Sequence, residues 1–314
     1  MEYRLLGNTG LTVSRLCFGS LTIGPLQANL PLQSGAAVIR AALAAGVNFI
    51  DTAELYDNYP YIRQALGGTS GVIVVSKAYA YTYEGMARSV ESACRALGRD
   101  YIDIFMLHEQ PSRLTLAGHA DALGCLTDAK AKGVVRAVGV STHTVEVVRA
   151  VADMPQVDVV HPIFNKAGIG IMDGTAAEMA AAIKVAAAAG KGVYAMKALG
   201  GGHLIADAPA AFDWVLANED LSAVAVGMQS PEEVAYNVAV FSGRPPAPGL
   251  AEQLGRRRRR LLVEDWCAGC GRCVERCPAG ALRLEDGKVV ADSGRCLLCG
   301  YCGAHCPEFC LKII

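Results

Sequence analysis

The C-terminal end of the chain carries two copies of one cysteine pattern. The first copy is Cys267-x2-Cys270-x2-Cys273-x3-Cys277-Pro278, and the second is Cys296-x2-Cys299-x2-Cys302-x3-Cys306-Pro307. Together they use eight of the twelve cysteines and repeat at an offset of 29 residues. Cysteines at this spacing typically hold iron–sulfur clusters. The pattern therefore predicts a small, internally duplicated unit at this end of the chain.

The spacing also predicts which thiolates share a cluster. Three thiolates on a tight loop bind three corners of an iron–sulfur cube, and the proline-flanked fourth reaches the other cube. We therefore expect two 4Fe–4S clusters, the first held by Cys267, Cys270, Cys273 and Cys306 and the second by Cys296, Cys299, Cys302 and Cys277. Structural zinc would leave the trailing Cys-Pro unexplained, and disulfides would imply a secreted chain. Residues 262–314 resemble a dicluster ferredoxin, and we expect Cys310 to pack beside a cluster without binding it.

The rest of the 314-residue chain has the length and pattern of a single (β/α)8 barrel. Short, nearly continuous apolar runs alternate with helix-length segments, as expected for parallel strands covered on both faces. The expected strands lie near 16–19, 48–53, 72–77, 102–107, 137–141, 157–163, 192–197 and 223–227. Residues 3–14 predict a β-hairpin that plugs one end of the barrel. The expected fold is thus an α/β barrel (1–242), a linker (243–261) and a small α+β dicluster domain (262–314).

Charge and composition limit the partners. The net charge is −1, so no overall field attracts nucleic acid or an anionic membrane. The amino terminus lacks the apolar stretch of a signal peptide, and no membrane span is expected. Cluster thiolates must stay reduced, so we expect a reducing, anaerobic cytoplasm. The five arginines Arg256–Arg260 are expected to form a solvated helix face or to clamp an acidic surface between the domains, rather than to bind nucleic acid.

Three polar residues end predicted strands, where the reacting groups of a barrel lie. They are Asp51, Lys77 and His108, and Tyr56 follows Asp51 by five residues. A carbonyl that is being reduced needs a proton donor and a group that orients its oxygen. A tyrosine can donate this proton if an adjacent ammonium lowers its pKa and a carboxylate holds that ammonium. Each residue has a plain alternative role: a helix cap for Asp51, a solvated side chain for Lys77 and a core residue for His108.

Residues 1–242 resemble the aldo/keto reductase family. The resemblance is carried by Tyr3–Ser14, Phe49–Ala53, Ser76-Lys77, Leu107-His108 and Gly139–Ser141. It implies that Asp51, Tyr56, Lys77 and His108 form a catalytic tetrad. Tyr56 would be the general acid, tuned by Lys77 and Asp51, and His108 would orient the carbonyl of a small-molecule substrate.

The family binds a nicotinamide nucleotide across the strand ends, so the resemblance implies NAD(H) or NADP(H). The positions that match or replace its nucleotide contacts are Ser141, Thr142, His161, Asn165, Met196, Lys197, Gly200, Gly227, Ser230, Glu233 and Asn237. His161, Met196 and Thr142 replace the usual Gln, Tyr and Asn, and the glycines at 200–202 resemble a diphosphate cradle. Gly227 and Glu233 replace basic residues that hold a 2′-phosphate, so we expect NADH to bind better than NADPH. Alternatively, Glu233 is simply an exposed helix residue.

Clusters pass single electrons, whereas nicotinamides transfer a hydride, and this mismatch leaves three hypotheses open. The first is a carbonyl-reducing enzyme whose clusters exchange electrons with an external carrier such as ferredoxin. In the second, a flavin in the barrel relays electrons, because flavins handle both modes. In the third, the barrel is a docking scaffold with an idle tetrad, because one fold supports many functions.

Overall fold

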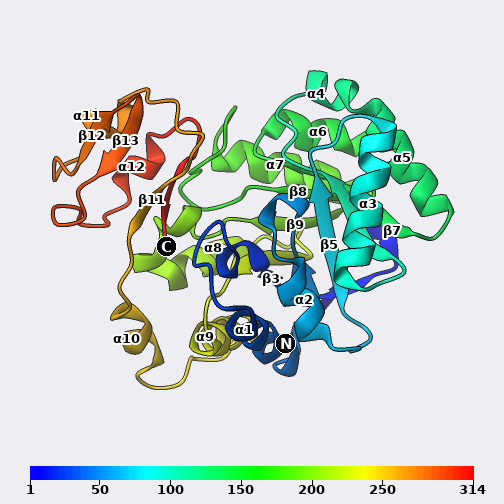
Figure 1. Cartoon of the computed structure of the whole chain (residues 1–314), viewed down its shortest axis with the longest axis horizontal. Coiled ribbons are helices and arrows are strands. Elements are labelled where there is room, and N and C mark those ends of the chain that lie inside the picture. The colour runs from blue at the N-terminus through cyan, green and yellow to red at the C-terminus, as the bar shows by residue number, and fades with distance from the viewer.

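The computed structural model describes all 314 residues and contains a closed barrel of eight parallel strands (Figure 1). The order around the barrel is β10-β3-β4-β5-β6-β7-β8-β9, and β10 closes it by pairing with β3. The strands are β3 (Leu16–Gly19), β4 (Phe49–Asp51), β5 (Ile73–Ala78), β6 (Ile102–Leu107), β7 (Val135–Thr142), β8 (Val159–Pro162), β9 (Gly192–Met196) and β10 (Ala223–Gly227). All eight expected strands are therefore present, with ends shifted by a few residues.

Side chains alternate between two apolar clusters along these strands. Phe49, Val75 and Met106 point into the barrel, while Ile50, Val74 and Phe105 join the larger cluster beneath the helices. This period of two follows from the pleat of a strand. Because both faces are buried, the sequence runs are continuously apolar rather than alternating.

A hairpin closes the end of the barrel where the strands begin. It consists of β1 (Tyr3–Leu5) and β2 (Thr12–Ser14), joined through a 3-10 turn at Gly7–Thr9. Leu6, Leu11 and Val13 are buried in the barrel's interior cluster. The hairpin thus plugs the barrel as its sequence predicted, and leaves the opposite end open for a site.

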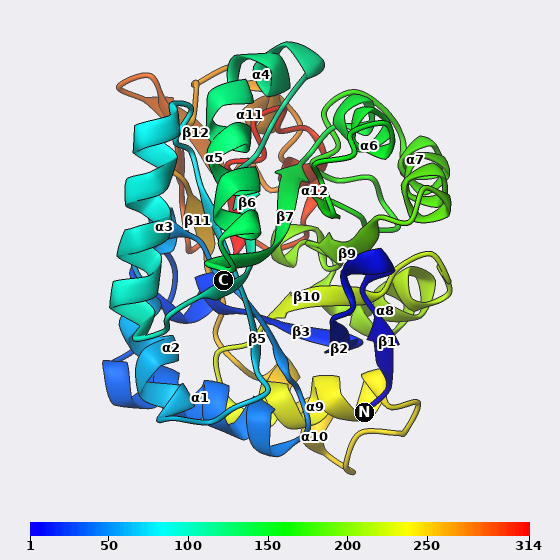
Figure 2. The ribbon, with the colours of Figure 1, turned by 90° about the vertical axis from the view of Figure 1, so that its right-hand side faces the viewer.

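Helices surround the barrel, and Figure 2 shows α3 and α5 lying outside β5 to β7. Local signals set their ends: Oγ1 of Thr82 caps α3 by accepting from the Gly85 amide, and Gly98 ends that helix with φ 67°. The helices are α1 (Leu32–Ala44), α2 (Tyr59–Leu66), α3 (Tyr83–Leu97), α4 (Arg113–Gly118), α5 (Ala120–Ala131), α6 (Val145–Ala152), α7 (Ala176–Ala188), α8 (Ala208–Leu216) and α9 (Pro231–Phe241). No helix is both long and apolar enough to cross a membrane.

The remaining chain forms a short helix and a small second unit beside the barrel (Figure 1, orange to red). Its four strands make two antiparallel pairs, β11 with β14 and β12 with β13. The elements are α10 (Leu250–Gly255), β11 (Leu261–Val263), α11 (Arg272–Glu275), β12 (Leu282–Glu285), β13 (Lys288–Ala291), α12 (Tyr301–Ala304) and β14 (Leu311–Ile313).

The second unit packs on the barrel through β14 and α12. A Cβ on Gly202 would lie 2.1 Å from the carbonyl oxygen of Ile313, and a Cβ on Gly201 would lie 2.8 Å from the Phe309 ring. From the barrel, His203 reaches the unit through its Nε2, which lies 2.9 Å from the Leu311 carbonyl oxygen. The glycine segment that resembled a diphosphate cradle therefore contacts the C-terminal strand.

Candidate active site

The strand ends bring three of the predicted catalytic side chains to the open end of the barrel. Asp51, Lys77 and His108 follow the inward-facing residues Phe49, Val75 and Met106 by two positions each. Because side chains alternate along a strand, all three point toward the barrel axis. Each is at least 95% buried. The sequence pattern and the barrel geometry agree on this placement.

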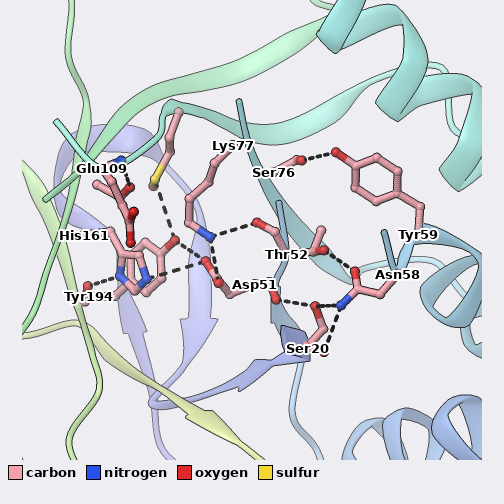
Figure 3. A network of polar contacts seen from close by, with 12 residues as sticks. Ser20, Asp51, Thr52, Asn58, Tyr59, Ser76, Lys77, Glu109, His161 and Tyr194 are labelled. Carbon is pink, nitrogen blue, oxygen red and sulfur yellow. Dashed lines mark hydrogen bonds and ion pairs between the residues drawn. The ribbon is translucent and has the colours of Figure 1, made fainter. Parts of the chain in front are cut away.

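Asp51 and Lys77 form a buried ion pair (Figure 3). Nζ of Lys77 lies 2.8 Å from Oδ2 of Asp51 and also donates to the Thr52 carbonyl oxygen at 2.8 Å. Burial alone would raise the pKa of Asp51, but the charges of Lys77 and His161 and its hydrogen bonds hold that pKa below its usual value. The pair therefore keeps an ammonium fixed at the base of the site.

Tyr194 completes this network, although the sequence alone did not identify it. Its hydroxyl donates to Oδ1 of Asp51 at 2.7 Å. His161 stacks on the Tyr194 ring with centroids 3.8 Å apart, and its Nε2 lies 3.7 Å from the same Oδ1 (Figure 3). Burial lowers the pKa of His161 to about 4, so this ring is neutral near pH 7. The inward register of Tyr194, two residues before Met196, was the signal that could have revealed it.

Tyr56 and His108 face each other across the cavity. Their rings meet edge to face with centroids 5.8 Å apart, and Nζ of Lys77 lies 5.2 Å from the centre of the Tyr56 ring. The prediction that Lys77 lowers the pKa of Tyr56 is wrong. Burial and the charges of Asp51 and Glu109 raise that pKa well above its usual value of 10. The physical reason is that Asp51 already pairs with the ammonium, so the phenol experiences the charges of two carboxylates in a largely enclosed site. It stays protonated at neutral pH.

His108 is neutral as well. Burial, followed by the charge of Lys77, lowers its pKa to about 3. Its Nδ1 is buried and has no hydrogen-bond partner within the chain. A buried polar atom without a partner is costly, and this nitrogen has almost no accessible surface through which a ligand could reach it.

A chain of contacts leads from His108 toward the second unit. Tyr79 stacks on His108 with centroids 4.3 Å apart and donates from its hydroxyl to Glu109. The other Glu109 oxygen lies 3.6 Å from Nε2 of His143, and that nitrogen lies 2.9 Å from Nζ of Lys197. Glu109 and Lys197 both have a positive φ, 46° and 60°, which non-glycine residues rarely adopt. Glu109 and His143 were not identified from the sequence, although Glu109 directly follows His108.

Apart from Tyr194 and Thr52, which lie behind the surface, these groups line one cavity of about 1310 Å³ between the barrel and the second unit. Ligand pockets commonly measure about 300–1,000 Å³, so this one has room for a cofactor and a substrate together. Its lining includes Tyr56, Lys77 and His108 from the barrel and Cys299 and Lys312 from the second unit.

The predicted nucleotide contacts divide into two groups. Seven line the cavity: Ser141, His161, Met196, Lys197, Gly227, Glu233 and Asn237. Thr142, Asn165, Gly200 and Ser230 do not line it. The Asn165 side chain is bonded to both backbone groups of Ile169, Thr142 donates to the Gln110 carbonyl oxygen, and Ser230 caps α9. The side chains of Thr142, Asn165 and Ser230 therefore hold the backbone around the cavity in place and do not contact its interior.

The residues expected to bind the carboxamide of a nicotinamide are only partly free to do so. Oγ of Ser141 accepts from the Glu109 amide at 2.9 Å, and Nδ1 of His161 lies 2.6 Å from the Tyr194 carbonyl oxygen. Asn165 is also fully engaged. The groups expected to receive the carboxamide are thus mostly committed to other partners.

At the far end of the cavity, Glu233 meets the arginine run. Its Oε1 pairs with Arg257 at 2.6 Å, and its Oε2 accepts from the Gln229 amide at 2.7 Å. Arg256 pairs with Glu252, so two of the five arginines have carboxylate partners. Arg257, Arg258 and Arg259 line the cavity. The pair of Arg256 lies within the linker, so the Arg257 pair is the one that joins the run to the barrel.

The cysteines of the second unit gather in two sets that fit the expected clusters. Cys277, Cys296, Cys299 and Cys302 line one small cavity together. In the other set, burial and the nearby thiols of Cys306, Cys270 and Cys267 raise the pKa of Cys273 to about 11. Cys302 also lies near Cys273, and the assignment of the eight thiols to two clusters stays a prediction. No three such side chains converge tightly enough for a single metal ion.

The two repeats share a backbone contact to sulfur. The Ala281 amide donates to Sγ of Cys277 at 3.3 Å, and the Cys310 amide donates to Sγ of Cys306 at 3.3 Å. Hydrogen bonds to ligand sulfurs are one way a protein tunes cluster potential. The Cys310 thiol also lies 3.3 Å from that of Cys306 and is buried.

An eight-stranded barrel with a buried Asp–Lys pair, a Tyr and a His at its open end, joined to paired four-cysteine sets, is the architecture of an iron–sulfur oxidoreductase. Comparison of sequences agrees. The model of the aldo/keto reductase family matches residues 15–208, and that of the 4Fe-4S dicluster domain matches residues 261–307. The chain belongs to the aldo/keto reductase family.

Individual relatives are distant. The chain is 24% identical to an L-galactose dehydrogenase of Arabidopsis thaliana over 285 residues, covering 77% of this chain and 88% of that protein. It is 34% identical to an aldo-keto reductase of Mycobacterium ulcerans over 142 residues, 41% of this chain and 49% of the relative. A solved putative aldo-keto reductase from Pseudomonas aeruginosa superposes with a TM-score of 0.66 at 27% identity, covering 77% of this chain and 94% of that one.

Proposed function

We propose that this oxidoreductase reduces a carbonyl of a small molecule at the barrel mouth, and that its two clusters exchange electrons with an external carrier in the cytoplasm. One observation carries this proposal. The four side chains Asp51, Tyr56, Lys77 and His108 line the same cavity as Cys299, which belongs to the second cluster set.

In this proposal Tyr56 donates the proton. Its raised pKa keeps the phenol protonated at neutral pH, so it can protonate an oxygen as negative charge develops there. Lys77, held by Asp51, keeps a positive charge 5.2 Å from the centre of the Tyr56 ring, where it would attract the negative charge that develops on the carbonyl oxygen. Neutral His108 offers a ring nitrogen that orients the carbonyl oxygen.

Electrons and protons must balance. Reducing a carbonyl to an alcohol takes two electrons and two protons. Tyr56 supplies the proton on oxygen, and the proton on carbon arrives with both electrons as a hydride, or comes from solvent when the electrons arrive singly from the clusters. When bound, 4Fe–4S clusters supply single electrons and a nicotinamide supplies a hydride. Two clusters in one chain match the two-electron requirement. We propose that the external carrier is a ferredoxin or a similar small protein.

Anaerobic steady-state assays of Tyr56→Phe test the proposal. Loss of a general acid commonly lowers turnover by about 10²- to 10⁴-fold, and we expect a loss in this range. Tyr81→Phe is the matched control, because Tyr81 is 65% exposed on a loop outside the cavity lining. Unchanged turnover in Tyr56→Phe would refute the tetrad assignment and favour a barrel that serves only as a docking scaffold.

A bound flavin is the second candidate, favoured by the size of the shared cavity and by the incomplete fit to a nicotinamide. A flavin accepts single electrons and passes on pairs. Acid extraction of protein made under flavin-sufficient conditions is expected to release a yellow chromophore if this version holds. A colourless extract would exclude it.

A further inference from the structure

Two lysines, one from each unit, lie together in the wall of the cavity. Lys197 follows β9 of the barrel, and Lys312 lies in β14. Their Nζ atoms lie 4.6 Å and 3.3 Å from the centre of the same ring, that of Phe309. Lys312 is only 5% exposed, and both residues line the cavity. Lys197 is partly exposed, and its positive charge disfavours that of Lys312.

Neither lysine has a carboxylate partner within ion-pair distance. Lys197 contacts Nε2 of His143 at 2.9 Å, and Lys312 donates to the Phe309 carbonyl oxygen. The acidic groups that face them are Glu109 and Glu264. Glu109 is engaged with Tyr79 and His143, and burial raises the pKa of Glu264. Because an ammonium has three donors, each lysine retains donors for a ligand.

Burial lowers the pKa of both lysines, and the charge of Lys197 lowers that of Lys312 further. A buried charge without a partner is unfavourable, so a bound anion would stabilise both ammonium groups. Lys197 and Lys312 thus have the chemistry of an anion-binding site, with N–H donors that no group of the chain occupies.

The lysine pair is connected to the proposed catalytic groups. His143, beside Lys197, faces Glu109, and Glu109 accepts from Tyr79, whose ring stacks on His108. His108 itself lines the same cavity. His108 and Tyr56 line the same cavity as the two lysines, so a molecule held at the lysines lies in a space that these groups share.

We propose that Lys197 and Lys312 bind the carboxylate of the substrate, so that the substrate is a small oxo acid and the cluster-bearing unit completes its binding site. This inference rests on the proposed function and specifies its substrate class. The diphosphate of a nucleotide is also an anion that two lysines can bind. The experiment distinguishes it from the carboxylate of a substrate.

The test is calorimetric binding of pyruvate to the anaerobic full-length protein without an electron donor, compared with its neutral ester methyl pyruvate. We expect the wild type to prefer pyruvate and Lys312→Met to weaken pyruvate binding at least tenfold without weakening that of the ester. Lys197→Met tests the same site from the barrel side if Lys312→Met folds poorly. Lys312→Arg should retain most of the affinity. Lys288→Met is the control, because Lys288 lies in β13 with an exposed side chain.

Equal binding of pyruvate and its ester by the wild type, or undiminished pyruvate binding in both methionine variants, would overturn the inference. A loss of ADP-ribose binding in those variants, with pyruvate binding intact, would assign the lysines to a nucleotide diphosphate and also overturn it. Tyr56→Phe should still bind pyruvate. Failure of the proposed reduction is therefore distinguishable from failure of this site.

Discussion

The hydroxyl of Tyr194 donates a 2.7 Å hydrogen bond to Oδ1 of Asp51, the carboxylate whose other oxygen pairs with Lys77. Both oxygens of this buried carboxylate are therefore satisfied by groups from other strands. The contact joins β9 to β4 and β5 across the barrel interior. It fixes the ammonium that lies beside Tyr56.

Tyr194→Phe should destabilise the protein and slow turnover. The variant leaves one oxygen of a buried carboxylate without its donor, which costs about 1–3 kcal/mol. Anaerobic urea unfolding measures the change. Tyr101→Phe is the control, because Tyr101 is 37% exposed and forms no side-chain hydrogen bond. Equal stability of the two variants would show that the Tyr194 contact adds little.

Stability should fall in acid, partly because of His161. Its folded pKa of about 4 lies below the unfolded value of about 6.5, so below pH 6.5 the unfolded chain binds a proton that the folded chain does not. The stabilisation present near pH 7 is therefore lost as the pH falls from 6.5 toward 4. Between pH 7 and pH 5 this amounts to about 2 kcal/mol.

His161→Gln should remove that part of the pH dependence. Denaturant unfolding at pH 7 and pH 5 is expected to show a loss about 2 kcal/mol smaller than in the wild type. The same pH dependence in His161→Gln and wild type would contradict the assignment of a neutral, buried ring.

Cys310 should be dispensable for cluster assembly. Its thiol touches Cys306, yet it falls outside both four-cysteine patterns. Cys310→Ala should retain about eight irons per chain, whereas Cys306→Ala should lose about half of them. Iron assay and low-temperature EPR of anaerobic protein provide the measurement. Loss of one cluster in Cys310→Ala would show that Cys310 is a ligand and change the first set.

Arg257 is expected to reduce the preference for NADH over NADPH that Glu233 would otherwise give. The sequence predicts that Glu233 disfavours a 2′-phosphate, but Arg257 pairs with that carboxylate and is itself partly exposed. Arg257→Ala frees Glu233, so the ratio of the NADPH to the NADH dissociation constant should rise about two- to fivefold, as expected for a partly exposed ion pair. Calorimetry with both nucleotides measures it, and Arg256→Ala is the control. An unchanged ratio would show that Glu233 does not determine which of the two nucleotides binds more tightly.

Much of this architecture could be predicted because the signals are local. The cysteine spacing, the eight apolar runs and the polar residues at Asp51, Lys77 and His108 all lie within short stretches of sequence. The period of two in a strand then places those side chains on the barrel axis. The same rule applies to Tyr194, whose polar role shows only once Asp51 is known to lie opposite it.

Contacts between the two units could not be predicted in this way. The glycines at 200–202 resemble a diphosphate cradle, yet Gly201 and Gly202 pack on Phe309 and Ile313, more than a hundred residues away. The raised pKa of Tyr56 likewise depends on how burial and surrounding carboxylates outweigh one ammonium. Such balances depend on the three-dimensional arrangement, which no local pattern encodes.

We propose that the barrel and the clusters act on one substrate in one cavity. Stopped-flow absorption under anaerobic conditions tests it: the clusters are reduced with dithionite, excess reductant is removed, and a carbonyl substrate accepted in steady state is added. We expect the clusters of the wild type to reoxidise at the rate of turnover and those of Tyr56→Phe to stay reduced at least 100-fold longer. Equal reoxidation in the two proteins, or none in either, would contradict the claim.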